Sequence, residues 1–228
     1  MLAVCVFAQE SQVPNKNRIS INLGSMSPLG DLASDEVGFA EVGLGFSIDY
    51  AISVSKIVAV TMGFTSGKMK MNEDLFNQKY GVNSFYINSV GTGKRDYNLT
   101  AFVVGAEART NGKHYFYFNP YFGRAKFVNP EQHYNFFDES NPNDVSKYVR
   151  INVVEKSAES LVYGFKMGAN FSITDHIGIG LFGKYDEGLF SLSGKDSQTV
   201  NFETVEYINN SVVKFKSLTT GISLIFSF

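Results

Sequence analysis

The chain shows a two-residue alternation of apolar and polar positions that recurs in eight segments. In the segment Ala40–Ile52, every even-numbered residue is apolar. The odd-numbered residues opposite them are mainly small or polar: Glu41, Gly43, Gly45, Ser47, Asp49 and Ala51. Because successive side chains of a β-strand point to opposite faces, each such segment predicts a strand with one apolar face and one small, polar face.

The alternation predicts eight strands along most of the chain. They are Ile19–Gly24, Ala40–Ile52, Val58–Thr65, about Arg95–Arg109, about His114–Phe127, Leu161–Ile173, Ile177–Asp186 and Ser217–Phe228. The fifth segment is ambiguous, because phenylalanines alternate with tyrosines and Pro120 interrupts the ladder. We assign its phenylalanines, Phe116, Phe118 and Phe122, to the apolar face.

The connections between these segments are alternately short and long. Short breaks follow the second, fourth and sixth strands, at Ser53–Lys56, Thr110–Lys113 and Thr174–His176. Asn111-Gly112 supplies the positive φ angles that a tight hairpin demands. The long breaks span roughly Pro28–Gly38, Gly67–Lys94, Val128–Ala158 and Gly194–Asn210. Short turns at one rim and long loops at the other are typical of outer-membrane barrels, with both termini on the periplasmic side and the long loops extracellular.

The composition of the two faces favours lipid outside over a packed core inside. The apolar face of Leu161–Ile173 is longer than the ~9–11 residues that a tilted membrane strand needs. The opposite face carries mainly Gly, Ser, Thr and Asn, which suits a narrow lumen, whereas a soluble barrel such as a lipocalin would expose many Lys and Glu. The predicted fold is therefore all-β, an eight-stranded antiparallel up-and-down transmembrane β-barrel.

Aromatic residues fall near both ends of the predicted strands. Those near the short turns are Tyr50, Tyr115, Phe171 and Phe228, and those near the long loops are Phe39, Phe64, Phe127 and Phe190. This placement predicts the two interfacial girdles in which amphipathic rings lie at headgroup level. Ordinary β-propensity accounts for part of the same distribution.

The chain divides into a short leader, a short linker and one domain. Residues 1–8 resemble the end of a signal peptide, 9–17 a periplasmic segment, and 18–228 the barrel. The single cysteine lies in the leader, so the mature chain has none, as expected after export. The net charge of −2 and the lack of a basic stripe argue against nucleic-acid binding.

The closing run Gly221–Phe228 alternates in polarity and ends in phenylalanine. It resembles the C-terminal signal of outer-membrane proteins, and with the eight-strand rhythm the chain resembles the small OmpA/OmpX-like barrels, particularly the outer-membrane β-barrel domain of Bacteroidota. The resemblance implies a Gram-negative outer membrane as the location. It also implies recognition of the Phe228 strand by the barrel-assembly machinery and contacts with outer-membrane lipid, lipopolysaccharide and other envelope proteins.

Two lysines, Lys166 and Lys184, point into the predicted lumen at mid-height on adjacent strands. Buried lysines need anionic partners, and the candidates are Glu41, Asp49, Asp186 and also Glu107. The favoured interpretation is an internal ion-pair network that plugs the barrel. A path for small anions lined by the lysines is the alternative.

A catalytic role requires a histidine with a carboxylate near the outer rim. Only His133, beside Glu131 and Asp138, lies in a long loop, because His114 and His176 lie at the opposite turns. A lone loop histidine is usually solvated, so we expect no enzyme activity and no cofactor.

The same loop carries an acidic run and four aromatic residues. Asp138–Asp144 loosely resembles a calcium-binding loop but lacks the glycine and the distal glutamate of an EF-hand, so we expect no metal. The aromatic residues either cover the barrel mouth or contact a partner: Tyr134, Phe136, Phe137 and Tyr148.

The sequence thus favours a non-enzymatic barrel that displays its long loops for structure, adhesion or complex assembly. A narrow channel for small or apolar solutes is the alternative, and a lipid-modifying enzyme is disfavoured. A wide porin is disfavoured, because eight strands enclose no open aqueous bore.

Overall fold

The computed structural model describes residues 17–34, 38–72, 75, 85–87, 96–138, 149–200 and 202–228. For residues 85–87 and 133–138 it describes the backbone alone. The expected leader and most of the expected periplasmic segment lie outside these ranges. Within the described residues, no helix has the length and apolar composition needed to cross a membrane.

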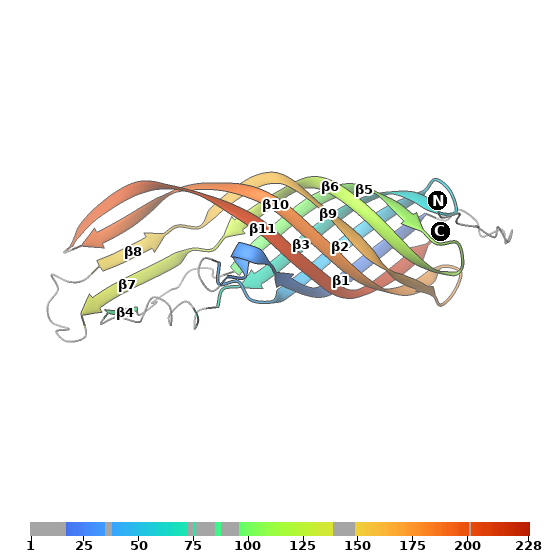
Figure 1. Cartoon of the computed structure of the whole chain (residues 1–228), viewed down its shortest axis with the longest axis horizontal. Coiled ribbons are helices and arrows are strands. Elements are labelled where there is room, and N and C mark those ends of the chain that lie inside the picture. The colour runs from blue at the N-terminus through green and yellow to red at the C-terminus, as the bar shows by residue number, and fades with distance from the viewer. Residues whose placement is uncertain are drawn as a thin grey trace, which may run out of the picture.

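Eight strands close into a ring, which confirms the predicted barrel (Figure 1). In ring order they are β11 (Glu203–Ser227), β1 (Arg18–Pro28), β2 (Gly43–Ser53), β3 (Val58–Lys70), β5 (Asp96–Arg109), β6 (His114–Asn129), β9 (Lys156–Ser172) and β10 (Ile177–Val200). All neighbours are antiparallel, and β10 pairs with β11 to close the ring. Closure leaves no free strand edge around the barrel wall.

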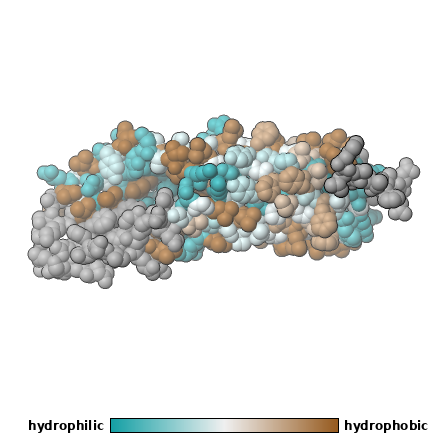
Figure 2. All heavy atoms as spheres, viewed as in Figure 1, coloured by the Kyte–Doolittle hydropathy of each residue, from teal (hydrophilic) through white to brown (hydrophobic). Residues whose placement is uncertain are grey.

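The apolar face of each barrel strand points outward, as the alternation predicts. Leu44 and Phe102 are each 68% exposed and Leu161 is 72% exposed, and Figure 2 shows apolar residues over much of the visible face of the barrel. Phe116, Phe118 and Phe122 also point outward, which confirms their assignment. The inward positions are buried and small or polar: Ser20, Asn22, Ser47, Thr61, Thr65, Asn119, Asn170, Thr219 and Ser223.

A belt of charged residues marks one limit of the apolar band. On the outward face of the strands it contains Lys68, Asp96, Arg124, Glu159, Glu187, Lys214 and Lys216. Two of its ion pairs, Lys68–Asp96 and Arg124–Glu159, each have N···O distances of 2.7 Å. Both chain termini lie at the opposite end of the barrel from this belt (Figure 1). At that end, the short turns fall where the sequence predicts, although Gly112 alone of the Asn111-Gly112 pair has positive φ.

The prediction of long loops was wrong for the last connection, because β10 and β11 continue as one hairpin. Their pairing extends to Val200 and Glu203, across the whole of the expected loop Gly194–Asn210. Continued pairing satisfies backbone groups that a loop would leave to water. Part of the third expected loop is also β-sheet: β7 (Gln132–Asp138) pairs with β8 (Val149–Val153), and β8 pairs with β10.

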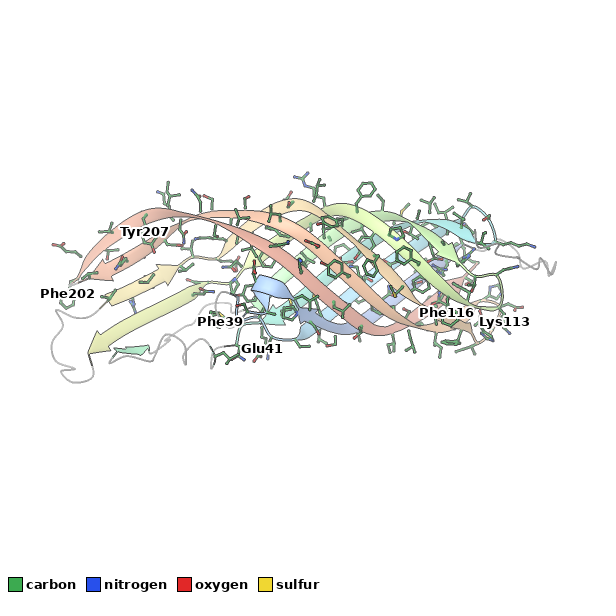
Figure 3. The ribbon with its side chains drawn as sticks, in the orientation of Figure 1. Phe39, Glu41, Lys113, Phe116, Phe202 and Tyr207 are labelled. Carbon is green, nitrogen blue, oxygen red and sulfur yellow. The ribbon has the colours of Figure 1, made fainter. Side chains whose placement is uncertain are left out.

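We call residues 189–200 of β10 and 203–215 of β11 the arm. It extends beyond the barrel on the side away from the termini, with Phe202 at its tip (Figures 1 and 3). The sheet it belongs to has the order β11-β10-β8-β7-β4, where β4 is Phe85–Ile87. A single 3₁₀ turn, η1 (Gly30–Leu32), lies against β11 near the root of the arm.

Candidate functional site

The half of the lumen nearer the termini is filled by buried ion pairs. Lys166 and Lys184 are direct cross-strand partners on β9 and β10, and both are buried. Lys166 Nζ lies 2.8 Å from Asp49 Oδ2, and Lys184 Nζ lies 3.1 Å from Asp186 Oδ1. The structure therefore brings together four of the six residues that the sequence proposes for a luminal network.

Each lysine also donates hydrogen bonds to neutral groups that line the lumen. Lys166 donates to Asn22 Oδ1 at 2.8 Å, and Lys184 donates to Thr65 Oγ1 at 2.9 Å. Asn22 in turn donates to Asp49 at 2.8 Å. Because buried charges are tolerated only when they are paired and hydrogen-bonded, this saturation holds two adjacent lysines stably inside the barrel.

The third luminal ion pair contains Glu107, which the sequence analysis proposed as a partner of the lysines, and Arg18, which the sequence analysis missed. Arg18 pairs with Glu107, and both side chains are almost fully buried. The Arg18 guanidinium also donates to the Tyr115 hydroxyl at 2.5 Å, which accepts a second bond from Asn170 at 2.8 Å. Arg18 lies on the same face of the strand as Ser20 and Asn22, so extending the predicted first strand back by one residue would have placed it inside.

The prediction that Glu41 belongs to this network was wrong. The alternation in the sequence begins at Ala40, but the β2 ladder begins only at Gly43. Glu41 precedes the strand and is exposed beside the barrel rim (Figure 3). Its backbone N–H donates to the Lys70 carbonyl at 2.7 Å, so its position is set by the backbone and not by a luminal lysine.

The half of the lumen nearer the arm is filled by an apolar core instead. Its centre is the fully buried trio Phe127, Phe190 and Phe215, whose ring centroids are 5.3–6.2 Å apart. Around them pack Met26, Leu32, Met69, Tyr97, Leu99, Val162 and Leu192. The Tyr97 hydroxyl donates to the Gly38 carbonyl at 2.5 Å, which ties the first long connection onto this core.

This core corrects the predicted girdle on the long-loop side. Phe39, Phe127 and Phe190 are 4% exposed or less, so they lie inside the protein and not at a lipid interface. Phe64 does point outward and packs against Phe102, with ring centroids 5.1 Å apart. At the other end Tyr50 stacks on Phe228, with centroids 6.3 Å apart, and Phe171 is exposed on the outer face. The prediction was wrong for Tyr115, because its hydroxyl accepts hydrogen bonds from Arg18 and Asn170 inside the lumen.

A further buried ion pair joins the barrel to the arm. Lys156 Nζ lies 2.8 Å from Asp196 Oδ2, and both side chains are at most 3% exposed. Asn209, on the facing strand of the arm, donates to the same carboxylate oxygen at 2.8 Å. These contacts connect β9 with both strands of the arm, so the arm is fixed to the barrel wall.

Little space remains among the luminal polar groups. The cavity among Arg18, Asp49, Glu107, Tyr117 and Lys166 has a volume of about 10 Å³, close to the minimum that holds one water molecule. The described lumen is therefore filled by paired charges in one half and by aromatic packing in the other.

The predicted loop residues can be placed only in part. His133, Tyr134, Phe136 and Phe137 lie on β7, whose backbone pairs with β8 and β4. The structure does not describe their side chains, and Tyr148 and residues 139–144 lie outside the described residues. Within the described part of the chain, no cluster of three or more His, Cys, Asp or Glu is arranged to hold a metal ion.

Comparison with known proteins identifies fold relatives only. No protein-family model and no curated protein matches the sequence. Among solved structures, Neisserial surface protein A is similar over 93% of this chain and 97% of its own, with 9% identity and a TM-score of 0.51. Ail, the attachment invasion locus protein of Yersinia pestis, is similar over 93% of this chain and 99% of its own, with 14% identity and a TM-score of 0.43. OprG of Pseudomonas aeruginosa is similar over 93% of this chain and 96% of its own, with 12% identity and a TM-score of 0.43. The chain has the fold of the small outer-membrane β-barrel proteins.

Proposed function

We propose that this chain is a closed, non-enzymatic outer-membrane barrel that holds the arm outside the cell for adhesion or for assembly with other envelope components. The observation that carries this proposal is the contrast between a filled lumen and a long, paired sheet that continues beyond the barrel. The termini would face the periplasm, and the charged belt would lie at the headgroups of the outer leaflet.

The contents of the lumen argue against the channel alternative. A solute would have to displace the Phe127–Phe190–Phe215 core and then separate the Lys166–Asp49 and Lys184–Asp186 pairs. Removing one member of a buried ion pair costs about 3–5 kcal/mol, so opening the whole column is incompatible with a stable barrel.

The arm supplies the surface that such a function requires. Apolar side chains stay exposed on it beyond the charged belt, where no hydrocarbon would cover them: Val205, Tyr207, Ile208 and Val212 are between 39% and 69% exposed. Exposed apolar residues grouped on a protruding element are typical of binding surfaces. Ail, a protein of similar fold, is named for attachment and invasion.

The test compares the parent chain with a shortened arm. Deleting residues 195–208 keeps the Ser193–Asn210 pair and leaves Gly194-Asn209 as a two-residue turn, which glycine in first position suits. The variant also carries Lys156→Thr, because the deletion removes Asp196. Bacteria displaying each form are assayed for settling and for adhesion to glass and matrix-protein coatings. Purified protein is assayed for conductance in planar bilayers.

We expect the deletion to abolish adhesion while the unboiled protein keeps the gel mobility of a folded barrel. We also expect no conductance from the parent chain or from a Lys166→Met/Lys184→Met variant. Adhesion that survives the deletion, or a parental conductance that the lysine variant abolishes, would contradict the proposal.

A further inference from the structure

The outer edge of β11 carries unpaired backbone groups along the arm. Below the arm this edge pairs with β1, and the pairing ends at Pro28–Ser217, followed by a bond from Leu29 N–H to the Lys216 carbonyl. From residue 203 to 215, no described strand pairs with it. Because the Lys216 carbonyl points to this edge, alternation directs the backbone groups of the even residues 204–214 the same way. The arm thus presents a strand template to a partner.

The side chains along this edge are complementary to their own reversed sequence. Consider a second β11 that pairs antiparallel with the first so that Asn210 lies opposite its own copy. Each even-numbered residue then lies opposite an even-numbered residue, as the direction of the free backbone groups requires. Glu206 then faces Lys214, Ile208 faces Val212, and Asn210 faces its own copy. On the other face Tyr207 lies opposite Val213. The pair 206–214 joins opposite charges, the pairs 208–212 and 207–213 join apolar or aromatic side chains, and Asn210 meets its own copy. The remaining pair sets the Asn209 amide opposite the Ser211 hydroxyl.

The neighbouring symmetric registers lose this match. A centre at Asn209 sets Glu206 against Val212 and Ile208 against Asn210. A centre at Ser211 restores a Glu206–Lys216 pair but sets Ile208 against Lys214, and the Lys216 carbonyl is already bonded to Leu29. The centre at Asn210 therefore gives the best ladder, over residues 206–214, and it ends before Lys216.

We propose that the partner of the arm is a second copy of this chain that projects from a facing membrane. This proposal rests on the proposed function, because it names what the arm binds. Antiparallel pairing reverses the strand direction, so the two barrels point away from each other, each with its termini at the end away from the arm (Figure 1). Two copies in one membrane share an orientation and cannot form this ladder. The exposed Ile208 and Val212, 69% and 64% accessible, become covered in it.

The experiment uses phospholipid vesicles that carry the full chain, in two fluorescent colours, and measures tethering between colours. Glu206→Lys gives a copy with two positive residues at the paired positions, and Lys214→Glu gives a copy with two negative ones. Each variant alone should tether about tenfold less than the parent, because two cross-strand ion pairs become two like-charge pairs. Mixed vesicles, one colour carrying each variant, should regain parental tethering. Such rescue excludes misfolding as the cause of the loss.

A second variant tests the backbone ladder. Asn210→Pro removes an N–H that points to the free edge and not to β10, so an edge strand tolerates it. It should abolish tethering, whereas the matched Asn210→Thr variant should retain it. Parental tethering by either charge variant alone, no rescue on mixing, or tethering to protein-free vesicles would overturn the proposal. If self-tethering fails while adhesion to other surfaces still requires the arm, the proposed function stands without self-recognition. If neither depends on the arm, both proposals fall.

Discussion

Removal of one carboxylate from the lumen should destabilise the barrel far more than removal of one from its surface. Asp49→Asn keeps the size and shape of the side chain but leaves Lys166 without its anionic partner at 2.8 Å. The amide oxygen at position 49 and the Asn22 carbonyl oxygen can still accept hydrogen bonds from Lys166, but the compensating negative charge is lost, and the cross-strand neighbour is the like-charged Lys184.

The expected cost follows from the burial of the pair. Breaking a buried ion pair on one side costs about 3–5 kcal/mol, and we expect about 3 kcal/mol because the Asp49 side chain is 20% exposed. The matched control is Glu159→Gln on the outer face. Its pair with Arg124 has a similar N···O distance, 2.7 Å, but side-chain exposures of 53% and 76%. An exposed pair contributes about 0–1 kcal/mol, so the control should change little.

The free energy of unfolding is measured by urea titration of each variant in phospholipid vesicles, with the folded fraction read from the mobility of unboiled samples on a gel. The variant Asp49→Asn/Lys166→Met removes both charges and should recover about half of the loss or more, because no unpaired cation remains. Equal costs for Asp49→Asn and Glu159→Gln, or no recovery in the double variant, would refute the assignment of Lys166 and Asp49 to a closed, dry lumen.

Three other outcomes follow from the positions of side chains along β10, β6 and β2. Leu181→Arg, in the apolar band, should cost about 2–4 kcal/mol in the same titration, whereas Ser191→Arg should cost under about 1. Ser191 lies on the same strand and the same face as Leu181 but ten residues, about 33 Å, further along the strand, beyond Glu187. Equal costs for the two variants would contradict the position of the apolar band. Phe190→Ala should cost about 3–5 kcal/mol and expose the arm to limited proteolysis, because it leaves a cavity in the core. Phe122→Ala, on the lipid face, loses only the transfer of the ring from water to hydrocarbon, about 1.5–3 kcal/mol, and should leave the digestion pattern unchanged. Ser47→Thr in the lumen should shift the urea midpoint little, and a loss as large as that of Phe190→Ala would indicate that the polar half has no room for a methyl group.

Sequence alternation alone predicts the barrel because each face has a different solvent. Outward residues such as Leu44 and Phe102 must be apolar, while Ser47 and Asn22 line a narrow interior, and a one-residue slip would invert both faces. The same parity places Lys166 and Lys184 inside, next to each other. Continued to Phe127 and Phe190 at the ends of their strands, the same alternation of inward and outward side chains places both residues inside. The girdle assignment failed because it considered how far along the strand each aromatic residue lies and not which face of the strand it occupies.

The arm could not be predicted from the same signal. Residues 191–199 of β10 are mostly Ser, Gly, Lys, Asp, Gln and Thr, a composition typical of loops. They form a strand because the facing segment of β11 follows after a tight connection and offers a complete set of backbone partners. The buried Lys156–Asp196 pair belongs to this long-range packing, which local composition does not encode. Glu41 failed for the opposite reason, because the alternation in the sequence begins at Ala40, three residues before the β2 ladder begins at Gly43.

The apolar core and the arm belong to one structural unit, and this unit bears on the choice between display and transport. Phe190 and Leu192 of β10 and Phe215 of β11 belong to the arm, yet all three lie within the core that fills the lumen. A passage through the barrel would require these side chains to leave the lumen, which would detach the root of the arm from its support. Conversely, the arm keeps a fixed direction because its base is packed against Phe127 of β6 inside the lumen. In this barrel, closure of the lumen is therefore the condition for holding the arm rigid, so a variant that opened the lumen should lose adhesion as it gained conductance.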